Sequence, residues 1–329
     1  MIEQRGRARA SAIVIAMAGA LVAIVVIARF NFGAVLAAIR PIGATDFLVV
    51  IAAQLALFIP LGLAWWLAAP GQAAGRAPVF VWARLMREAA SDVLPFSQLG
   101  GVVIAARAAT SGGVTAAVAF GSSVVDISLE VVAQLLYTLI GIGLLVGHFG
   151  LHARGDRLLL PVLGGLTIAA AAVGGFILAQ RRGFALIERL VQRMMPIAAA
   201  HAAAAGRAVE AAYGRPARTW TCLGLHVACW FGSAAGTWLI LNFIGRPLPF
   251  LSVVAIESLL FAIRNAAFIV PSGLGVQEGA YALLGPLFGL PAEVALALSL
   301  LKRGRDIIVG IPVLLSWQIV EAQRPLRRE

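Results

Sequence analysis

Ionisable side chains interrupt the most apolar parts of this sequence. Eleven of them lie within long apolar runs: Arg107, Asp126, Glu130, Glu257, Arg264, Glu278, Glu293, Lys302, Arg303, Arg305 and Asp306. Each ionised group near the centre of a membrane helix costs about 2.5–3.5 kcal/mol on insertion scales, so such groups face one another or water. Because five are basic and six are acidic, their charges nearly cancel. We therefore expect a paired polar network or a cavity that receives a polar group.

The spacing of these residues indicates which of them share a helix face. Asp126 and Glu130 are four residues apart, and Gln134 continues the same face. Glu257 and Arg264 are seven residues apart, about 10 Å along a helix axis, which is too far for direct pairing. We expect each to find a partner on another helix, either in the acidic stripe at 126–130 or in the cluster "LKRGRD" at 301–306.

That cluster has two interpretations. Lys302 or Arg303 can reach Asp306 within one helix turn, which predicts a local ion pair. The cluster also lies near the middle of an apolar window, where burying even an ion pair costs free energy. This position favours an interpretation in which the charged side chains face the substrate.

The stretch "FIVPSGLGVQEGAYALLG" at 268–285 predicts a helix broken inside the membrane. Pro271 ends one helix, Ser272 is a suitable N-cap, and Gly273 and Gly275 permit a tight turn before a new helix near Val276. A helix N-terminus in the interior attracts a phosphate or carboxylate. The alternative is a tight cytoplasmic turn in which Glu278 complements the helix dipole, and Glu293, after Pro291, is assigned mainly to such a role.

The elements that carry these residues are membrane helices. The chain is 61% hydrophobic with a mean hydropathy of +0.93, and its charged fraction of 12% is about half that of a soluble domain. Apolar windows long enough to cross a bilayer occupy 11–28, 45–69, 114–147, 158–179, 219–243, 250–270 and 291–320. Backbone groups in lipid must be paired within the segment, so we expect an all-α polytopic bundle. Two shorter segments, 95–111 and 272–290, are interrupted by Pro and Gly.

The basic residues predict the orientation of the chain. Sixteen Lys and Arg residues lie at the termini and in the linkers at 70–95 and 180–218, against five in the remaining loops at 29–44, 148–157 and 244–249. By the positive-inside rule both termini are expected in the cytoplasm, with the basic loops attracted to anionic phospholipid headgroups. Nucleic-acid binding is not expected. The linkers contain amphipathic patterns typical of interfacial helices, and the first apolar run is interpreted as a retained signal anchor.

We predict a single integral-membrane domain over 1–329. A weak repeat relates "LPFSQLGGVV" at 94–103 to "VPSGLGVQEG" at 270–279, which suggests halves of about 1–150 and 151–329. No H-E-x-x-H or G-x-S-x-G motif is present, so no catalytic residue and no cofactor are predicted. Cys222, His226 and Cys229 share a helix face, but without an obvious fourth ligand they are assigned to packing, and no metal is predicted.

The segments "PSGLGVQEGAYALLGPLFGLPAEVALALSLLKRGRD", "LPFSQLGG" and "SSVVDISLEVVAQ" resemble the flippase-like superfamily that includes the transmembrane part of lysylphosphatidylglycerol synthases. Within it the sequence is most similar to the hopanoid-associated HpnL branch. Ser272 and Gln277 depart from the commoner Pro-Gly-Gly-Leu-Gly-Val-Arg-Glu motif, and no soluble aminoacyl-transferase domain is found, so lipid synthesis is not expected. The resemblance implies lipid translocation in a bacterial inner membrane, with hopanoids or other polar-headgroup lipids as substrates.

These observations together predict a lipid transporter. The substrate-binding residues are expected to be Arg264, Ser272, Gly273, Gly275, Glu278, Lys302, Arg303 and Arg305, and the charge network Arg107, Asp126, Glu130, Glu257 and Asp306. Three alternatives remain: a non-catalytic scaffold for lipid-biosynthesis enzymes, a permease for small solutes or ions, and an enzyme acting on lipid headgroups. Glu278 and Asp306 are the only acid–base candidates for the enzyme.

Overall fold

The computed structural model describes residues 32–94, 97–149, 206–267, 270 and 273–322. Helices form the regular structure throughout these ranges, and no strand occurs in them, which confirms the all-α prediction. The predicted spans at 11–28 and 158–179 lie outside the described residues, as does most of the 181–218 linker.

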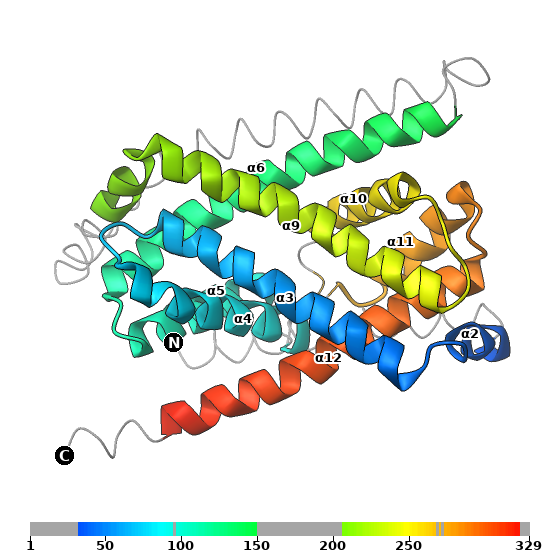
Figure 1. The fold of residues 1–329 in the computed structure, drawn as a ribbon, viewed down its shortest axis with the longest axis horizontal. Coiled ribbons are helices and arrows are strands. Elements are labelled where there is room, and N and C mark those ends of the chain that lie inside the picture. Colours follow the sequence, from blue (N-terminus) through cyan, green and yellow to red (C-terminus); the bar gives the residue numbers. More distant parts are fainter. Residues whose placement is uncertain (1–31, 95–96, 150–205, 268–269, 271–272, 323–329) are drawn as a thin grey trace, which may run out of the picture. The chain divides into compact units, whose positions relative to one another are not determined.

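The helices follow the predicted windows closely (Figure 1). They are α2 (Phe32–Ile39), α3 (Ala44–Ala68), the short 3-10 helix η1 (Ala74–Arg76), α4 (Ala77–Val93), α5 (Ser97–Ser111), α6 (Ala116–Phe149), α9 (Pro216–Phe243), α10 (Phe250–Ala266), α11 (Val276–Leu284), the 3-10 helix η3 (Gly285–Phe288) and α12 (Ala292–Ala322). Three of them, Ala44–Ala68, Ala116–His148 and Pro216–Phe243, are long and apolar enough to cross a membrane. The protein is a membrane protein.

The chain forms two compact units built from non-contiguous segments. Unit 1 combines the described parts of Met1–Leu57, Leu85–Ala105 and Gly232–Glu329, and unit 2 combines those of Phe58–Arg84 and Ala106–Phe231. These boundaries differ from a division near residue 150, and the internal repeat stays a prediction.

Helix α12 is the packing centre of unit 1. Leu296 and Ala297 pack against Val35 of α2, and Leu314 packs against Ala89 and Ala90 of α4. Helix α11 packs on both α12 and α10. Gly310 allows α12 to approach α4 closely, since a Cβ at this position would lie 2.5 Å from a methyl carbon of Val93.

Unit 2 is held together by close contacts among α3, α4 and α6. A Cβ on Gly62 would lie 2.3 Å from the Cα of Val81, so only glycine permits this approach of α3 to α4. The Trp65 indole donates a hydrogen bond of 2.9 Å to Ser122 Oγ on α6 and stacks edge-on against Phe80 at 5.4 Å. These contacts fix the helices that carry the buried charges of unit 2.

Two local expectations are wrong. The segment 29–44 was expected to be a loop, but it contains α2, whose Val35 is fully buried. The N-cap of α11 is Gly275 and not Ser272, because the backbone turns at Gly275 with φ of +78°, a conformation that glycine adopts without strain. Ser272 itself lies outside the described residues.

Candidate functional site

A buried network in unit 1 surrounds the ammonium group of Lys302. Its Nζ donates hydrogen bonds to Glu257 Oε2 at 2.6 Å, Tyr281 OH at 2.8 Å and Thr237 Oγ1 at 3.1 Å. The Tyr281 hydroxyl in turn donates to Glu257 Oε1. An ammonium group has three protons to donate, so all of them are engaged. Lys302 was predicted to bind substrate, but its side chain lies in this closed network and does not line the cavity described below.

Glu278 links the start of α11 to α12. Its Oε2 accepts the Gly275 N–H at 2.9 Å, and its Oε1 accepts from Arg303 Nε at 2.9 Å. Glu278 therefore accepts a hydrogen bond from a backbone N–H that was predicted from the sequence to bind a ligand. The geometry corresponds to the alternative in which this carboxylate complements the helix dipole.

A cavity of about 290 Å³ lies beside this link, within unit 1. Its volume is at the lower end of the range of about 300–1,000 Å³ typical of small-molecule pockets. Two basic, two acidic and one amide side chain line it together with apolar groups: Asp92, Val93, Arg264, Leu274, Gln277, Arg303, Asp306, Ile307 and Ile311. Three separate helices, α4, α10 and α12, thus bring charged groups to one cavity.

Arg264 is held at the cavity without an ion pair to the described part of the chain. Its guanidinium carbon lies 5.7 Å from the ring centre of Phe261, one turn earlier on α10. A Cβ on Gly273 would lie 3.1 Å from Arg264 Nε, so the missing side chain of Gly273 leaves room for the guanidinium group. The backbone of Gly273 has φ of +58°. The turn before α11 therefore shapes the cavity through its small residues.

The acidic groups of the cavity have different partners. Asp306 Oδ1 accepts from Arg305 Nε at 2.9 Å and Nη2 at 2.7 Å, so the predicted pairing of Asp306 with Lys302 or Arg303 is wrong. Asp92 comes from α4, which is not one of the three candidate spans. Burial, followed by the nearby charges of Asp306 and Glu88, raises the pKa of Asp92 to about 8, while Arg264 and Arg305 oppose the shift.

One wall of the cavity is apolar and reaches the outer surface of α12. Ile307 and Ile311 line the cavity, yet their side chains are 43% and 44% exposed. Ile308 and Leu315, on the same helix, are also more than half exposed. The charged interior of the cavity therefore adjoins a surface that is suited to hydrocarbon chains.

A second buried network lies in unit 2. Arg84 Nη1 donates to Asp126 Oδ2 and to Glu130 Oε2, each at 3.1 Å, and Nη2 donates to Glu130 Oε1 at 2.5 Å. His226 Nε2 lies 3.0 Å from Asp126 Oδ1. The acidic stripe thus pairs with Arg84, and not with Arg264 or the 301–306 cluster as the sequence analysis allowed.

The sequence analysis misplaced Arg84. It was counted with the cytoplasmic linker at 70–95, but its side chain is only 1% exposed. The missed signal is its spacing, since Arg84 follows the buried Phe80 by four residues and so lies on the buried face of α4.

The remaining predicted residues are less central. Arg107 on α5 is exposed, and its place in a charge network stays a prediction. Glu293 lies in the first turn of α12, in agreement with its assignment to a helix start. Gln277, which was noted only as a departure from the family motif, lines the cavity and donates to Ser299 Oγ at 3.1 Å.

Comparison with known families agrees with this architecture. Residues 10–313 match the family described as the lysylphosphatidylglycerol synthase TM region. No curated protein and no solved structure matches the chain. Because the family match covers more than nine-tenths of the sequence, the chain belongs to the family of the lysylphosphatidylglycerol synthase transmembrane region.

Proposed function

We propose that the protein moves polar-headgroup lipids across a bacterial inner membrane, with the headgroup passing through the cavity of unit 1. The observation that carries this proposal is the position of a charged cavity directly beside an apolar outer surface of α12. A lipid has the same division into a polar headgroup and apolar chains.

The charges of the cavity suit a headgroup that carries polar or ionised groups. Arg264 and Arg303 offer guanidinium groups, which recognise phosphate and carboxylate oxygens in pairs. Asp92 and Asp306 offer acceptors for ammonium or hydroxyl groups. In a cavity of low dielectric constant these contacts are stronger than in water. The charged groups that line the cavity therefore support its role in binding a polar headgroup.

Because the cavity is small, the acyl chains or ring system of the lipid would lie outside it. A volume of about 290 Å³ holds a headgroup but not a whole lipid. The apolar part would lie against Ile307, Ile308 and Ile311, whose side chains are 43%, 53% and 44% exposed. This arrangement lets a headgroup leave water while the hydrocarbon stays in the bilayer.

Two further parts of the proposal rest on the sequence. The asymmetry of the basic residues supports cytoplasmic termini, and the resemblance to the hopanoid-associated branch supports hopanoids or their derivatives as substrates. Neither ATP nor a cofactor is required by this account. Membrane lipids are the partners.

Lipid that co-purifies with the protein tests the proposal. We expect mass spectrometry of gently solubilised wild-type protein to reveal a bound polar lipid, and Arg264→Gln to reduce its occupancy. Arg246→Gln is the matched control, because Arg246 is exposed and lies outside the cavity. Equal lipid occupancy in the wild type and in both variants would refute a headgroup site at Arg264.

The test also separates two of the alternatives, the scaffold and the enzyme. A scaffold would lose its partner enzymes on deletion without any change in purified lipid binding. An enzyme would convert the bound lipid, and its product would be found in the same extract.

A further inference from the structure

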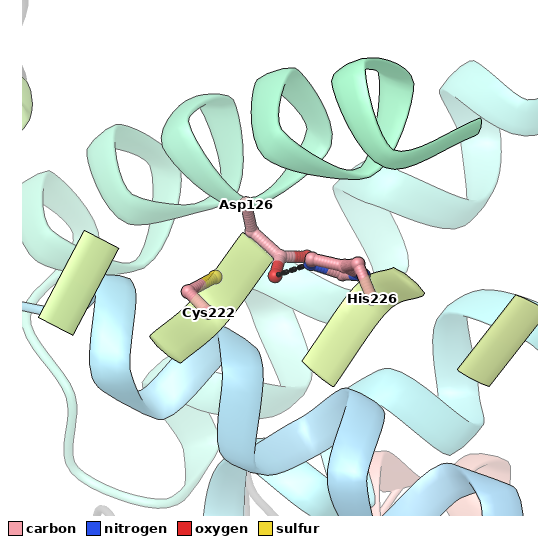
Figure 2. A group of neighbouring side chains, drawn as sticks. All are labelled: Asp126, Cys222 and His226. Atoms are coloured by element: carbon pink, nitrogen blue, oxygen red, sulfur yellow. Dashed lines mark hydrogen bonds and ion pairs between the residues drawn. The ribbon is translucent and has the colours of Figure 1, made fainter. Parts of the chain in front are cut away.

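Three side chains with metal-binding atoms converge in unit 2. Asp126 comes from α6, and Cys222 and His226 come from successive turns of α9, as Figure 2 shows. One carboxylate oxygen, the thiol sulfur and one imidazole nitrogen all lie within 4.8 Å of one another. The cavity of unit 1 uses none of these residues. The cluster therefore lies outside the proposed lipid site.

The chemistry of the three groups corresponds to zinc coordination. Thiolate, imidazole and carboxylate are the three ligand types that bind Zn²⁺. Tetrahedral zinc holds its ligand atoms about 3–4 Å apart, given bond lengths of about 2.0–2.3 Å. His226 Nε2 and Asp126 Oδ1 are already 3.0 Å apart. The other separations, which are at most 4.8 Å, are therefore close to this spacing.

The surroundings orient the carboxylate. Arg84 binds Asp126 through Oδ2 at 3.1 Å, while the oxygen that faces His226 is Oδ1. A neighbouring group that holds the second oxygen of a ligating carboxylate is a common feature of metal sites.

The local charge also favours a cation. Asp126 and Glu130 carry two negative charges against one positive charge on Arg84. Binding through sulfur requires that the Cys222 thiol lose its proton to solvent as the metal–sulfur bond forms. A divalent ion then offsets the negative charges of the thiolate and of Asp126. Such compensation matters here because Cys222 and His226 are fully buried and Asp126 is 1% exposed.

We propose that Asp126, Cys222 and His226 supply three of the four ligands of one divalent ion of the zinc class, in a buried site. The apolar cluster around Cys222, which includes Ala64, Val125 and Leu129, keeps the site away from bulk water. Such a site ties α6 to α9. From the sequence, Cys222, His226 and Cys229 were assigned to packing because no fourth ligand was obvious, and Asp126 was not considered because it is about a hundred residues from His226 in the chain.

Metal content and cobalt absorption test this site. The purified full-length protein is loaded with Zn²⁺ or Co²⁺ and freed of excess ion. We expect about one ion per chain, and a thiolate-to-cobalt charge-transfer band for the Co²⁺ form. Absence of the band, or less than about a tenth of an ion per chain, would overturn the proposal.

Substitution of the two cysteines provides a matched pair. Cys222→Ser removes the sulfur ligand and should abolish the charge-transfer band and weaken metal affinity by about tenfold or more. Cys229→Ser, on the same helix but outside the cluster, should change neither. A band that survives Cys222→Ser and disappears with Cys229→Ser would contradict the assignment. The cobalt spectrum of the wild type decides the question even if a variant fails to fold, and none of these readouts depends on lipid transport.

Discussion

The buried pair of Lys302 and Glu257 allows the strongest prediction about stability. The replacement Lys302→Met keeps a long flexible side chain but removes the ammonium group. It therefore breaks the hydrogen bonds of 2.6, 2.8 and 3.1 Å to Glu257, Tyr281 and Thr237. Glu257 is fully buried, and among the described residues it would keep the hydroxyl of Tyr281 as its one hydrogen-bond partner.

The magnitude follows from this geometry. Hydrogen bonds to a charged group contribute about 1.5–3 kcal/mol each to stability. Removal of one partner of a buried pair costs about 3–5 kcal/mol, because the other charge stays buried. We therefore expect Lys302→Met to lower the free energy of unfolding by about 3–5 kcal/mol. Arg246→Met, at an exposed position, should change it by no more than about 0.5 kcal/mol.

A double substitution separates a lost pair from lost packing. Lys302→Met combined with Glu257→Gln removes both charges, so the cost should fall to about 2 kcal/mol or less. Equilibrium unfolding in mixed detergent micelles, followed by tryptophan fluorescence, measures these differences. The reasoning would be refuted if the double variant lost as much free energy of unfolding as the two single variants, Lys302→Met and Glu257→Gln, lose in sum. Effects at independent sites add, whereas effects at coupled sites do not.

Three further predictions concern other parts of the molecule. Gly62→Ala places a methyl carbon 2.3 Å from the Val81 backbone and should destabilise the protein by about 1–3 kcal/mol, whereas Gly143→Ala, which meets no atom within 4 Å, should be neutral or stabilising in thermal unfolding. Because the pKa of Asp92 is raised to about 8, its ionisation opposes folding. The melting temperature of Asp92→Asn relative to that of the wild type should therefore increase as the pH rises from about 4 to 8 and stay constant above that. A relative melting temperature that falls over this pH range would contradict the shift in pKa. Arg84→Met leaves two carboxylates together and should cost about 3–5 kcal/mol, with partial rescue by Glu130→Gln; no loss of stability would mean that the ion pair seen at 2.5 Å is unimportant.

Periodic features of the sequence predicted the fold well. Helix α11 begins at Val276 as expected from the glycines before it, and α3, α6, α9 and α12 agree with their apolar windows to within three residues. Hydropathy succeeds here because a bilayer demands long apolar helices. Short helix α2 was missed because eight residues give too weak a periodic signal.

The pairing of charges was harder to predict. Glu257 was correctly expected to seek a partner on another helix, but sequence spacing alone did not distinguish Lys302 from its neighbours. Arg84 was assigned to a solvated linker because its segment is polar on average, although one face of that helix is buried. Long-range partners depend on how helices rotate against one another, and a single sequence carries little information about that rotation.

The glycine turn before α11 shows a similar limit. The sequence indicated a break in the helix and a free N-terminus for an anion. In the structure, Glu278 three residues later accepts the Gly275 N–H at 2.9 Å, so the protein itself satisfies this donor. The glycine at 273 instead makes room for Arg264.

Lipid movement between the leaflets of proteoliposomes tests the central claim most directly. A fluorescent polar lipid in the inner leaflet becomes accessible to an external quencher only after it crosses. We expect wild-type protein and Arg246→Gln to accelerate crossing, and Arg264→Gln to slow it by roughly tenfold or more, since loss of one charged hydrogen bond costs about 1.5–3 kcal/mol. Equal crossing rates for wild type, Arg264→Gln and protein-free vesicles would contradict the account.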